Sequence, residues 1–265
     1  MDKTPFTQVI ANLHAQGDGY RVTLPADWLQ GRTAYGGLVA AIGLEATLRA
    51  VPNLPPIRSA QVSFIGPSGD ELEITVQVLR RGRSVVFVEC TLSNERGMVA
   101  RCLFCFGAAR PSGLAAPVFT PPKFLPPETS SESISFEEAP AFVRHYETRV
   151  LSGGPPGSCS AKPELLVWVR HGDRDAHGSM VGLLGLADML PPAILSTLPR
   201  FVPISSMTWQ IDFFVSESPD DDGWRLLEAT AESATEGYSS QRMAIWDRQG
   251  RPLMASRQSL AIFDR

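Results

Sequence analysis

Alternation of apolar and polar residues marks two separate stretches of the chain and predicts two sets of β-strands. Over 72–78, apolar side chains occupy every second position, which is the period of a half-buried strand. Short turns separate this run from further apolar runs over 85–92 and 98–106. In the second stretch, the same pattern predicts strands over 206–215, 224–233, 239–246 and 253–263. Strands joined by such short turns are typical of antiparallel meanders.

An apolar helix is predicted ahead of each set of strands. The first begins at Gly36-Gly37 and runs through Leu44, and the second runs from about Met180 to Leu190, where two prolines stop it. A helix that is apolar on nearly every side has to be enclosed. We therefore expect an α+β fold of the tandem (double) hotdog type, in which each unit is a long buried helix wrapped by a curved antiparallel sheet.

The two halves repeat a short motif, which indicates duplication of one unit. Gly82-x-Ser84 matches Gly237-x-Ser239, and 18 residues separate each glycine from Ala100 and Ala255 respectively. By this register, Leu103 is the counterpart of Gln258. Proline and serine crowd the segment between the halves. The predicted division is an N-terminal hotdog over 1–110, a Pro/Ser-rich linker over 111–140 and a C-terminal hotdog over 141–265.

Composition narrows the class of protein. The chain has 265 residues, 43% of them hydrophobic and 20% charged, which is ordinary for a soluble globular protein. A net charge of -4 argues against a nucleic-acid partner, and no apolar run approaches the roughly 18 residues that membrane insertion needs. The first residues lack the pattern of a secretory signal, and four cysteines are too few for a disulfide framework. We expect a cytoplasmic protein.

Asp188 is the main candidate for chemistry. It is the only carboxylate between Ala176 and Pro199, and the residues one helical turn away, Leu184 and Pro192, offer it no cation. Burial without a partner raises a carboxyl pKa toward neutrality, which suits a general base. The alternatives are an exposed aspartate near a fraying helix end, or one that caps a backbone amide.

Glu45, the lone acid of the first helix, serves as a control. Arg49 follows it by four residues, which is the favourable order for a helical ion pair. This pattern is typical of a solvated helix face. If only one half is catalytic, we expect it to be the second.

Two polar residues on the later strands could complete a site with Asp188. Strict alternation over 206–213 places Ser206 on one face with Thr208, Gln210 and Asp212. Gln258 lies in a run of small and apolar residues, where its counterpart in the first half is apolar. The alternative for Gln258 is an exposed strand face.

The chain resembles the TesB-like acyl-CoA thioesterases of the double-hotdog type. The resemblance rests on four features in order: the Tyr35-Gly36-Gly37 helix entry, the Arg-rich turn over 79–84, the Pro-rich linker and the Ala255–Gln258 ending. It implies that Asp188, Ser206 and Gln258 hold the hydrolytic water, with Thr208 as an alternative to Ser206. It also implies an acyl-CoA substrate and a homodimer, with no metal and no redox cofactor.

Further residues are candidates for binding the substrate. Backbone amides of Gly36 and Gly37, beside Tyr35, could stabilise the oxyanion, although these glycines are equally explained by tight helix–sheet packing. Arg80, Arg81 and Arg83 could meet the phosphates of coenzyme A, although turn arginines are more often simply solvated.

Two other functions share the fold. A hotdog hydratase or dehydratase needs a histidine with an aspartate, and His145 and His177 fall outside the predicted helix and strands. A non-catalytic acyl-thioester-binding protein would show the same apolar helices and alternating strands. The loop group His171, Asp173, Asp175 and His177 lacks a cysteine or glutamate to complete a metal site.

Overall fold

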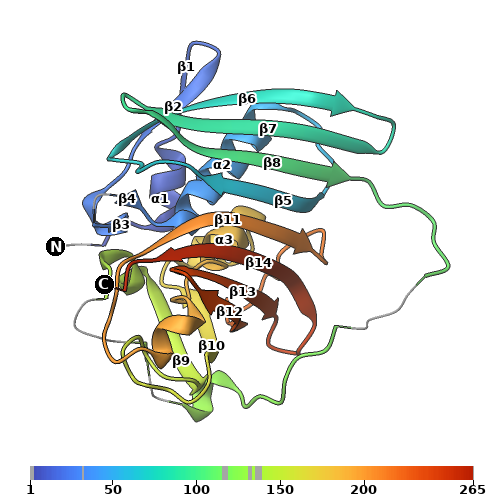
Figure 1. Cartoon of the computed structure of the whole chain (residues 1–265). Helices are drawn as coiled ribbons and strands as arrows, with labels where there is room; N and C mark the ends of the chain where they lie inside the picture. The colour runs from blue at the N-terminus through green and yellow to red at the C-terminus, as the bar shows by residue number, and fades with distance from the viewer. Residues whose placement is uncertain (1–2, 32, 115–118, 131–132, 135–138, 265) are drawn as a thin grey trace.

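A single antiparallel sheet forms the frame of the molecule. The computed structural model describes residues 3–31, 33–114, 119–130, 133–134 and 139–264. Its large sheet has 12 strands in the order β1-β2-β6-β7-β8-β5-β11-β14-β13-β12-β10-β9. The first six belong to the N-terminal half and the last six to the C-terminal half. In Figure 1 the two sets lie one above the other.

The elements of the N-terminal half follow the predicted order of early strands, helix and meander. They are α1 (Phe6–Ala11), β1 (His14–Gln16), β2 (Gly19–Thr23), η1 (Ala26–Trp28), β3 (Leu29–Gln30), β4 (Thr33–Ala34), α2 (Gly36–Ala50), β5 (Ile57–Phe64), β6 (Glu71–Arg81), β7 (Val85–Asn94) and β8 (Gly97–Gly107).

The C-terminal half repeats that order with a much shorter helix. Its elements, with those of the connecting segment, are η2 (Pro127–Thr129), η3 (Ala141–His145), β9 (Tyr146–Ser152), β10 (Glu164–His171), η4 (Arg174–Ala176), α3 (Met180–Leu186), η5 (Ala193–Thr197), β11 (Ile204–Phe213), β12 (Arg225–Thr235), β13 (Tyr238–Trp246) and β14 (Pro252–Ile262).

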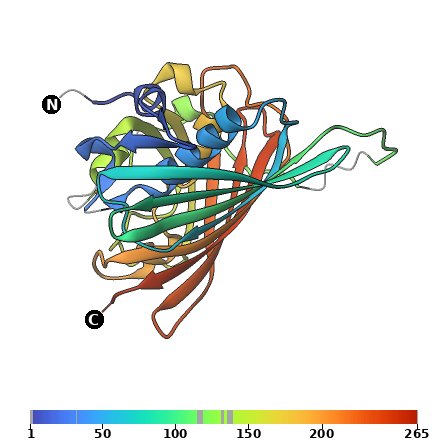
Figure 2. The same cartoon turned by 90° about the horizontal axis from the view of Figure 1, so that it is seen from above.

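The halves join where β5 pairs with β11, with Val62 opposite Trp209. The continuous sheet curves around α2 and α3, which lie together on its concave side (Figure 2). The helices approach closely at glycines: a Cβ on Gly37 would lie 2.4 Å from the carbonyl oxygen of Gly185. Each helix is apolar and buried over most of its length. The predicted tandem hotdog is confirmed.

The predicted end of the second helix is wrong. The last bond of the α-helical kind runs from the amide of Ala187 to Leu183, and Met189 then closes a tighter turn on Leu186. Pro191 and Pro192 have no N–H to continue the ladder, so the residues before them leave the helix. Asp188 therefore lies in the turn after α3 and not inside the helix.

The predicted faces of two strands also need correction. A bulge between Ser206 and Thr208 in β11 breaks the alternation, so Ser206 lies on the inner face while Thr208 is exposed on the outer face. In β8, Leu103 lies between the buried Cys102 and Phe104 and faces outward, whereas Gln258 faces inward and is 2% exposed. The register that paired Leu103 with Gln258 was thus shifted by one residue, which reverses the face of a strand.

The segment between β8 and β9 packs against the C-terminal half. Phe119 stacks on Trp246 with ring centroids 5.3 Å apart, and the indole N–H of Trp168 donates to the carbonyl oxygen of Leu125 at 2.8 Å. Residues 115–118, 131–132 and 135–138 of the predicted linker lie outside the described residues. No helix in the described ranges is long and apolar enough to cross a membrane.

Candidate active site

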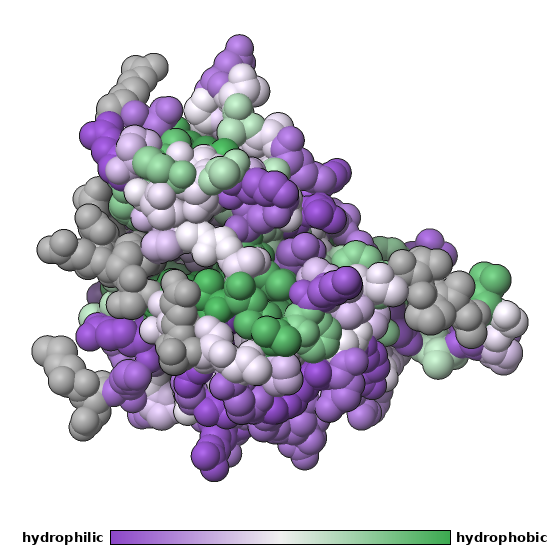
Figure 3. All heavy atoms as spheres, turned by 90° about the horizontal axis from the view of Figure 1, so that it is seen from below, coloured by the Kyte–Doolittle hydropathy of each residue, from purple (hydrophilic) through white to green (hydrophobic). Residues whose placement is uncertain are grey.

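Two adjoining hollows lie where the halves meet. The inner cavity is lined by Asp188, Gln258 and mostly apolar side chains from η3, the turn after α3 and the segment before β11. The outer groove is lined by more polar residues of β4, the start of α2 and the loop after β5. Gln30, Ile204 and Ser206 line both hollows. Figure 3 shows a band of apolar side chains along a hollow on the otherwise polar lower face.

Asp188 lies at the wall of the inner cavity, where the turn after α3 meets the first turn of α2. Burial raises the pKa of its carboxyl group to about 7, although a hydrogen bond from Gln258 and the backbone amide of Gly37 oppose the rise. No described cation pairs with it. The carboxylate is therefore poised between its two protonation states near neutral pH, as a general base requires.

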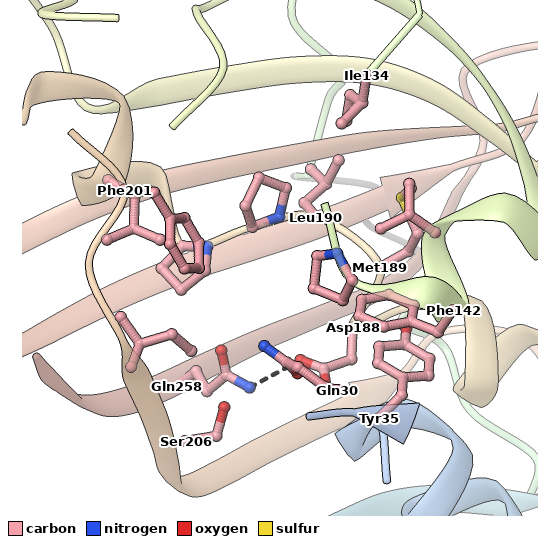
Figure 4. Close-up of a pocket in the computed structure, with 16 residues that line it drawn as sticks. Gln30, Tyr35, Ile134, Phe142, Asp188, Met189, Leu190, Phe201, Ser206 and Gln258 are labelled. Atoms are coloured by element: carbon pink, nitrogen blue, oxygen red, sulfur yellow. Dashed lines mark hydrogen bonds between the residues drawn. The ribbon is translucent and has the colours of Figure 1, made fainter. Parts of the chain in front are cut away.

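Gln258 reaches Asp188 from β14. Its side-chain amide donates to Asp188 Oδ1 at 2.8 Å (Figure 4). The strand places this amide on the inner face, among buried residues. The structure thus brings two of the three predicted water-holding residues into direct contact.

Ser206 lines the same cavity, because the bulge in β11 turns it inward. Thr208, the alternative for this position, is exposed on the opposite face of the sheet and lines neither the inner cavity nor the outer groove. The structure therefore contradicts the placement of Thr208 in the site.

The start of α2 at Tyr35-Gly36-Gly37 lies directly against the carboxylate of Asp188. A Cβ on Gly36 would lie 2.6 Å from Asp188 Oδ2, so only glycine allows the carboxylate to come this close. Because the amide of Gly37 interacts with Asp188, it is not free to meet a substrate oxyanion as predicted. Tyr35 lines the inner cavity with its ring, while its hydroxyl donates to the carbonyl oxygen of Gly185 at 2.7 Å.

The arginines of the β6–β7 turn do not reach this site. Arg81 lies in the row that runs through Val86 and Phe106 to Ile57 at the start of β5, whereas Ser206 lies beyond the opposite end of β5. At about 3.3 Å per residue, the two ends of β5 are roughly 20 Å apart. The expected phosphate contacts of Arg80, Arg81 and Arg83 are not supported at this site, and all three side chains are exposed.

Gln30 is a polar residue of the site that the sequence reasoning missed. It belongs to the two-residue strand β3, and its side chain converges with Asp188 and Gln258 (Figure 4). Two residues are too few to show a period, so no pattern could have marked it.

His145, His171 and His177 pack around the site and do not line it. His145 stacks on Trp28 with ring centroids 4.1 Å apart and lies 3.2 Å from Asp27. The Nε2 atom of His171 lies 2.9 Å from the carbonyl oxygen of Gly182, and that of His177 lies 2.9 Å from the carbonyl oxygen of His171. Among the described residues, none of the histidines lines the inner cavity or the outer groove.

Two family models match the chain, one in each half. The acyl-CoA thioesterase N-terminal domain matches residues 24–107, and the acyl-CoA thioesterase C-terminal domain matches residues 120–262. The chain belongs to the acyl-CoA thioesterase family. The order of the two models along this thioesterase-family chain agrees with the double hotdog, and the site described above uses residues from both matched regions.

Solved structures with the same fold cover nearly the whole of this thioesterase-family chain. A conserved protein of unknown function with a hotdog fold from Alicyclobacillus acidocaldarius matches with a TM-score of 0.88 at 20% identity, covering 98% of both chains. The acyl-CoA thioesterase II TesB2 from Mycobacterium marinum matches with a TM-score of 0.74 at 18% identity, covering 97% of both chains. No curated protein matches the sequence significantly.

Proposed function

We propose that this protein hydrolyses an acyl-CoA thioester to the free acid and coenzyme A, with Asp188 as the general base. The observation that carries the proposal is the contact of Asp188 with Gln258 at 2.8 Å in a largely apolar cavity that Ser206 also lines. A carboxylate with a pKa near 7, beside one hydroxyl and one amide, can orient a water molecule and accept its proton.

The reaction needs no protein nucleophile. The water oxygen attacks the thioester carbonyl carbon while its proton passes to Asp188. The tetrahedral intermediate then collapses, the carbon–sulfur bond breaks, and the thiolate leaves as the thiol after taking that proton. The developing oxyanion needs a donor, and the side-chain amide of Gln30 points into the cavity toward Asp188 and Gln258.

The two hollows suit the two parts of such a substrate. The inner cavity offers apolar walls from Phe142, Leu190 and Phe201 to an acyl group, since apolar surface is stabilised when it leaves water. The outer groove offers Thr33 and Ser205 to the polar pantetheine arm. The scissile bond would then lie between them, beside Ser206.

A hydratase is the weaker candidate because it needs a histidine at the reacting carbon. His145, His171 and His177 contact backbone carbonyl oxygens outside the cavity, and His14 is exposed on β1. A non-catalytic binding protein would share the cavity but would not need an ionisable group with a raised pKa inside it.

The test is thiol release from a panel of acyl-CoA esters by the wild type and by Asp188→Asn. We expect turnover on at least one ester and a loss of about a hundredfold or more in the variant, which keeps the shape but cannot accept a proton. Circular dichroism and thermal unfolding check that the variant remains folded. Undiminished turnover in folded Asp188→Asn would refute the assignment of the base.

A further inference from the structure

A chain of hydrogen bonds leads to Asp188 and includes Gln241, a residue with no assigned role. The backbone N–H of Ala193 donates to Gln241 Oε1 at 3.1 Å. The Nε2 atom of Gln241 donates to Gln258 Oε1 at 3.0 Å, and the Nε2 atom of Gln258 donates to Asp188 Oδ1 at 2.8 Å. Each glutamine thus accepts through its oxygen and donates through its nitrogen.

The backbone amide of Ala193 sets which atom donates and which accepts in every later hydrogen bond. A backbone N–H can only donate, so Gln241 must present its oxygen to Ala193 and its nitrogen to Gln258. Gln258 must then present its nitrogen to Asp188. Ala193 is fixed in turn, because it opens η5 directly after Pro191 and Pro192.

Both glutamines are buried from bulk solvent, which could otherwise replace a missing partner, and Gln258 borders the inner cavity. Gln241 is 1% exposed and Gln258 is 2% exposed, and they lie opposite each other on β13 and β14. The other described contact of the Gln241 amide is the sulfur of Met243 at 3.4 Å, a weak acceptor. A reversed amide would leave buried polar atoms unpaired, at substantial cost.

We infer that Gln241 is a positioning residue that holds Gln258 in the orientation in which it donates to the Asp188 carboxylate. The inference rests on the proposed function, in which that carboxylate is the base. A donating Gln258 favours the ionised form of Asp188. A reversed Gln258 would turn its oxygen to the carboxylate and favour the protonated, inactive form.

The main test replaces Gln241 by methionine, which has a similar length and no N–H. Freed from its donor, Gln258 populates both orientations. We expect the midpoint of the pH–rate profile to rise by about 0.5 to 1 unit, which lowers kcat at pH 7 by about 2- to 5-fold, with KM within about twofold.

A second variant, Ala193→Pro, removes the donor at which this chain of hydrogen bonds begins. Proline replaces the N–H that sets the direction by a ring carbon, so Gln241 Oε1 loses its donor and also has to move away. The backbone itself tolerates proline at the first residue of a 3-10 turn. Pro192 before it has a ψ of 127°, which is compatible with a following proline. We expect a smaller shift in the same direction.

Ser196→Ala is the matched control. Its hydroxyl, 1% exposed at the residue level, donates to the carbonyl oxygen of Ala193 at 2.8 Å in the same turn, outside the chain to Asp188. We expect it to lower the melting temperature without moving the pH profile. A purely structural role for Gln241 predicts that Gln241→Met behaves in the same way, and that result would overturn the inference.

A second readout separates this inference from the proposed function. Carbon NMR of the aspartate carboxyl groups reports the pKa of Asp188 in the folded protein without any turnover. We expect the pKa of Asp188 to rise in Gln241→Met and to stay in place in Ser196→Ala. An unchanged pKa in both Gln241→Met and Ala193→Pro refutes the positioning role, whereas full turnover in Asp188→Asn refutes the proposed function alone.

Discussion

Glu45 and Asp188 are acids in the corresponding helical parts of the two halves, and they differ in whether a cation pairs with the carboxylate. Glu45 lies within α2, where Arg49 Nε contacts its Oε1 at 2.7 Å and the two side chains are 21% and 34% exposed. Asp188 lies just past the end of α3, without a described cation, against the first turn of α2. One acid is paired with an arginine, and the other lacks a described cation and has a raised pKa.

The difference follows from the lengths of the two helices. The 15 residues of α2 fill the concave face of their own half with side chains such as Leu38 and Ile42. The seven residues of α3 stop early, and the two prolines turn the chain aside. The shortened helix leaves room for the inner cavity and places Asp188 at its wall. The proposed site therefore lies where the shorter helix ends, against the start of α2.

Two glycines of α2 offer the sharpest test of this contrast. In Gly36→Ala, the new Cβ would lie 2.6 Å from Asp188 Oδ2 and displace the carboxylate. We expect kcat/KM for thioester hydrolysis to fall by about 30- to 100-fold, because a displaced base loses most of its general-base contribution.

Gly43→Ala makes the same chemical change two turns further along α2. There the new Cβ would meet Cys102 Sγ at 3.4 Å, an ordinary contact, and alanine favours a helix over glycine. We expect activity within about twofold of the wild type and equal or higher stability. Equal losses in the two variants would show that α2 packing, and not the approach of Asp188, limits activity.

The fold was predictable because its strongest signals are local. The meander strands and the apolar helices show their periods directly, and β7, β8 and β13 lie within a few residues of the predicted ranges. Asp188 and Gln258 could be singled out because each is a polar residue in a run of mostly small or apolar residues, although an exposed position stayed open for both until the structure placed them at the cavity.

The other features of the site depend on irregular strands and on long-range contacts, which a periodic pattern in the sequence does not show. The bulge that turns Ser206 inward inserts one residue into a strand, and simple alternation misses it. The role of Gly36 depends on a carboxylate about 150 residues away in the sequence, and Gln30 comes from a two-residue strand. The alternative of solvated arginines at 80, 81 and 83 agrees with their exposure, and sequence order alone could not tell which end of the sheet carries the cavity.

The pH dependence of kcat/KM should follow the ionisation of Asp188 and not that of Glu45. Only the ionised form of Asp188 accepts a proton, and its pKa is about 7. We expect kcat/KM to rise about tenfold per pH unit below the midpoint and to level off above it. Glu45→Gln should leave this profile unchanged, while the residual activity of Asp188→Asn should show no such inflection. A midpoint near 4 in the wild type would contradict the raised pKa.

The smallest expected effect is on the free energy of unfolding, which neutralising Asp188 should raise and neutralising Glu45 should lower. Burial raises the pKa of Asp188 above its value of about 4 in the unfolded chain, so the folded state binds the proton more tightly. The free energy of unfolding therefore falls as pH rises from about 4 to about 7, and Asp188→Asn removes that loss. At pH 8 we expect the variant to be more stable than the wild type by about 1–3 kcal/mol in urea unfolding. Glu45→Gln loses an ion pair and should be less stable by about 0.3–0.5 kcal/mol. Destabilisation by Asp188→Asn at pH 8 would mean that the carboxylate is favoured by its surroundings, which contradicts its role as a base held near neutrality.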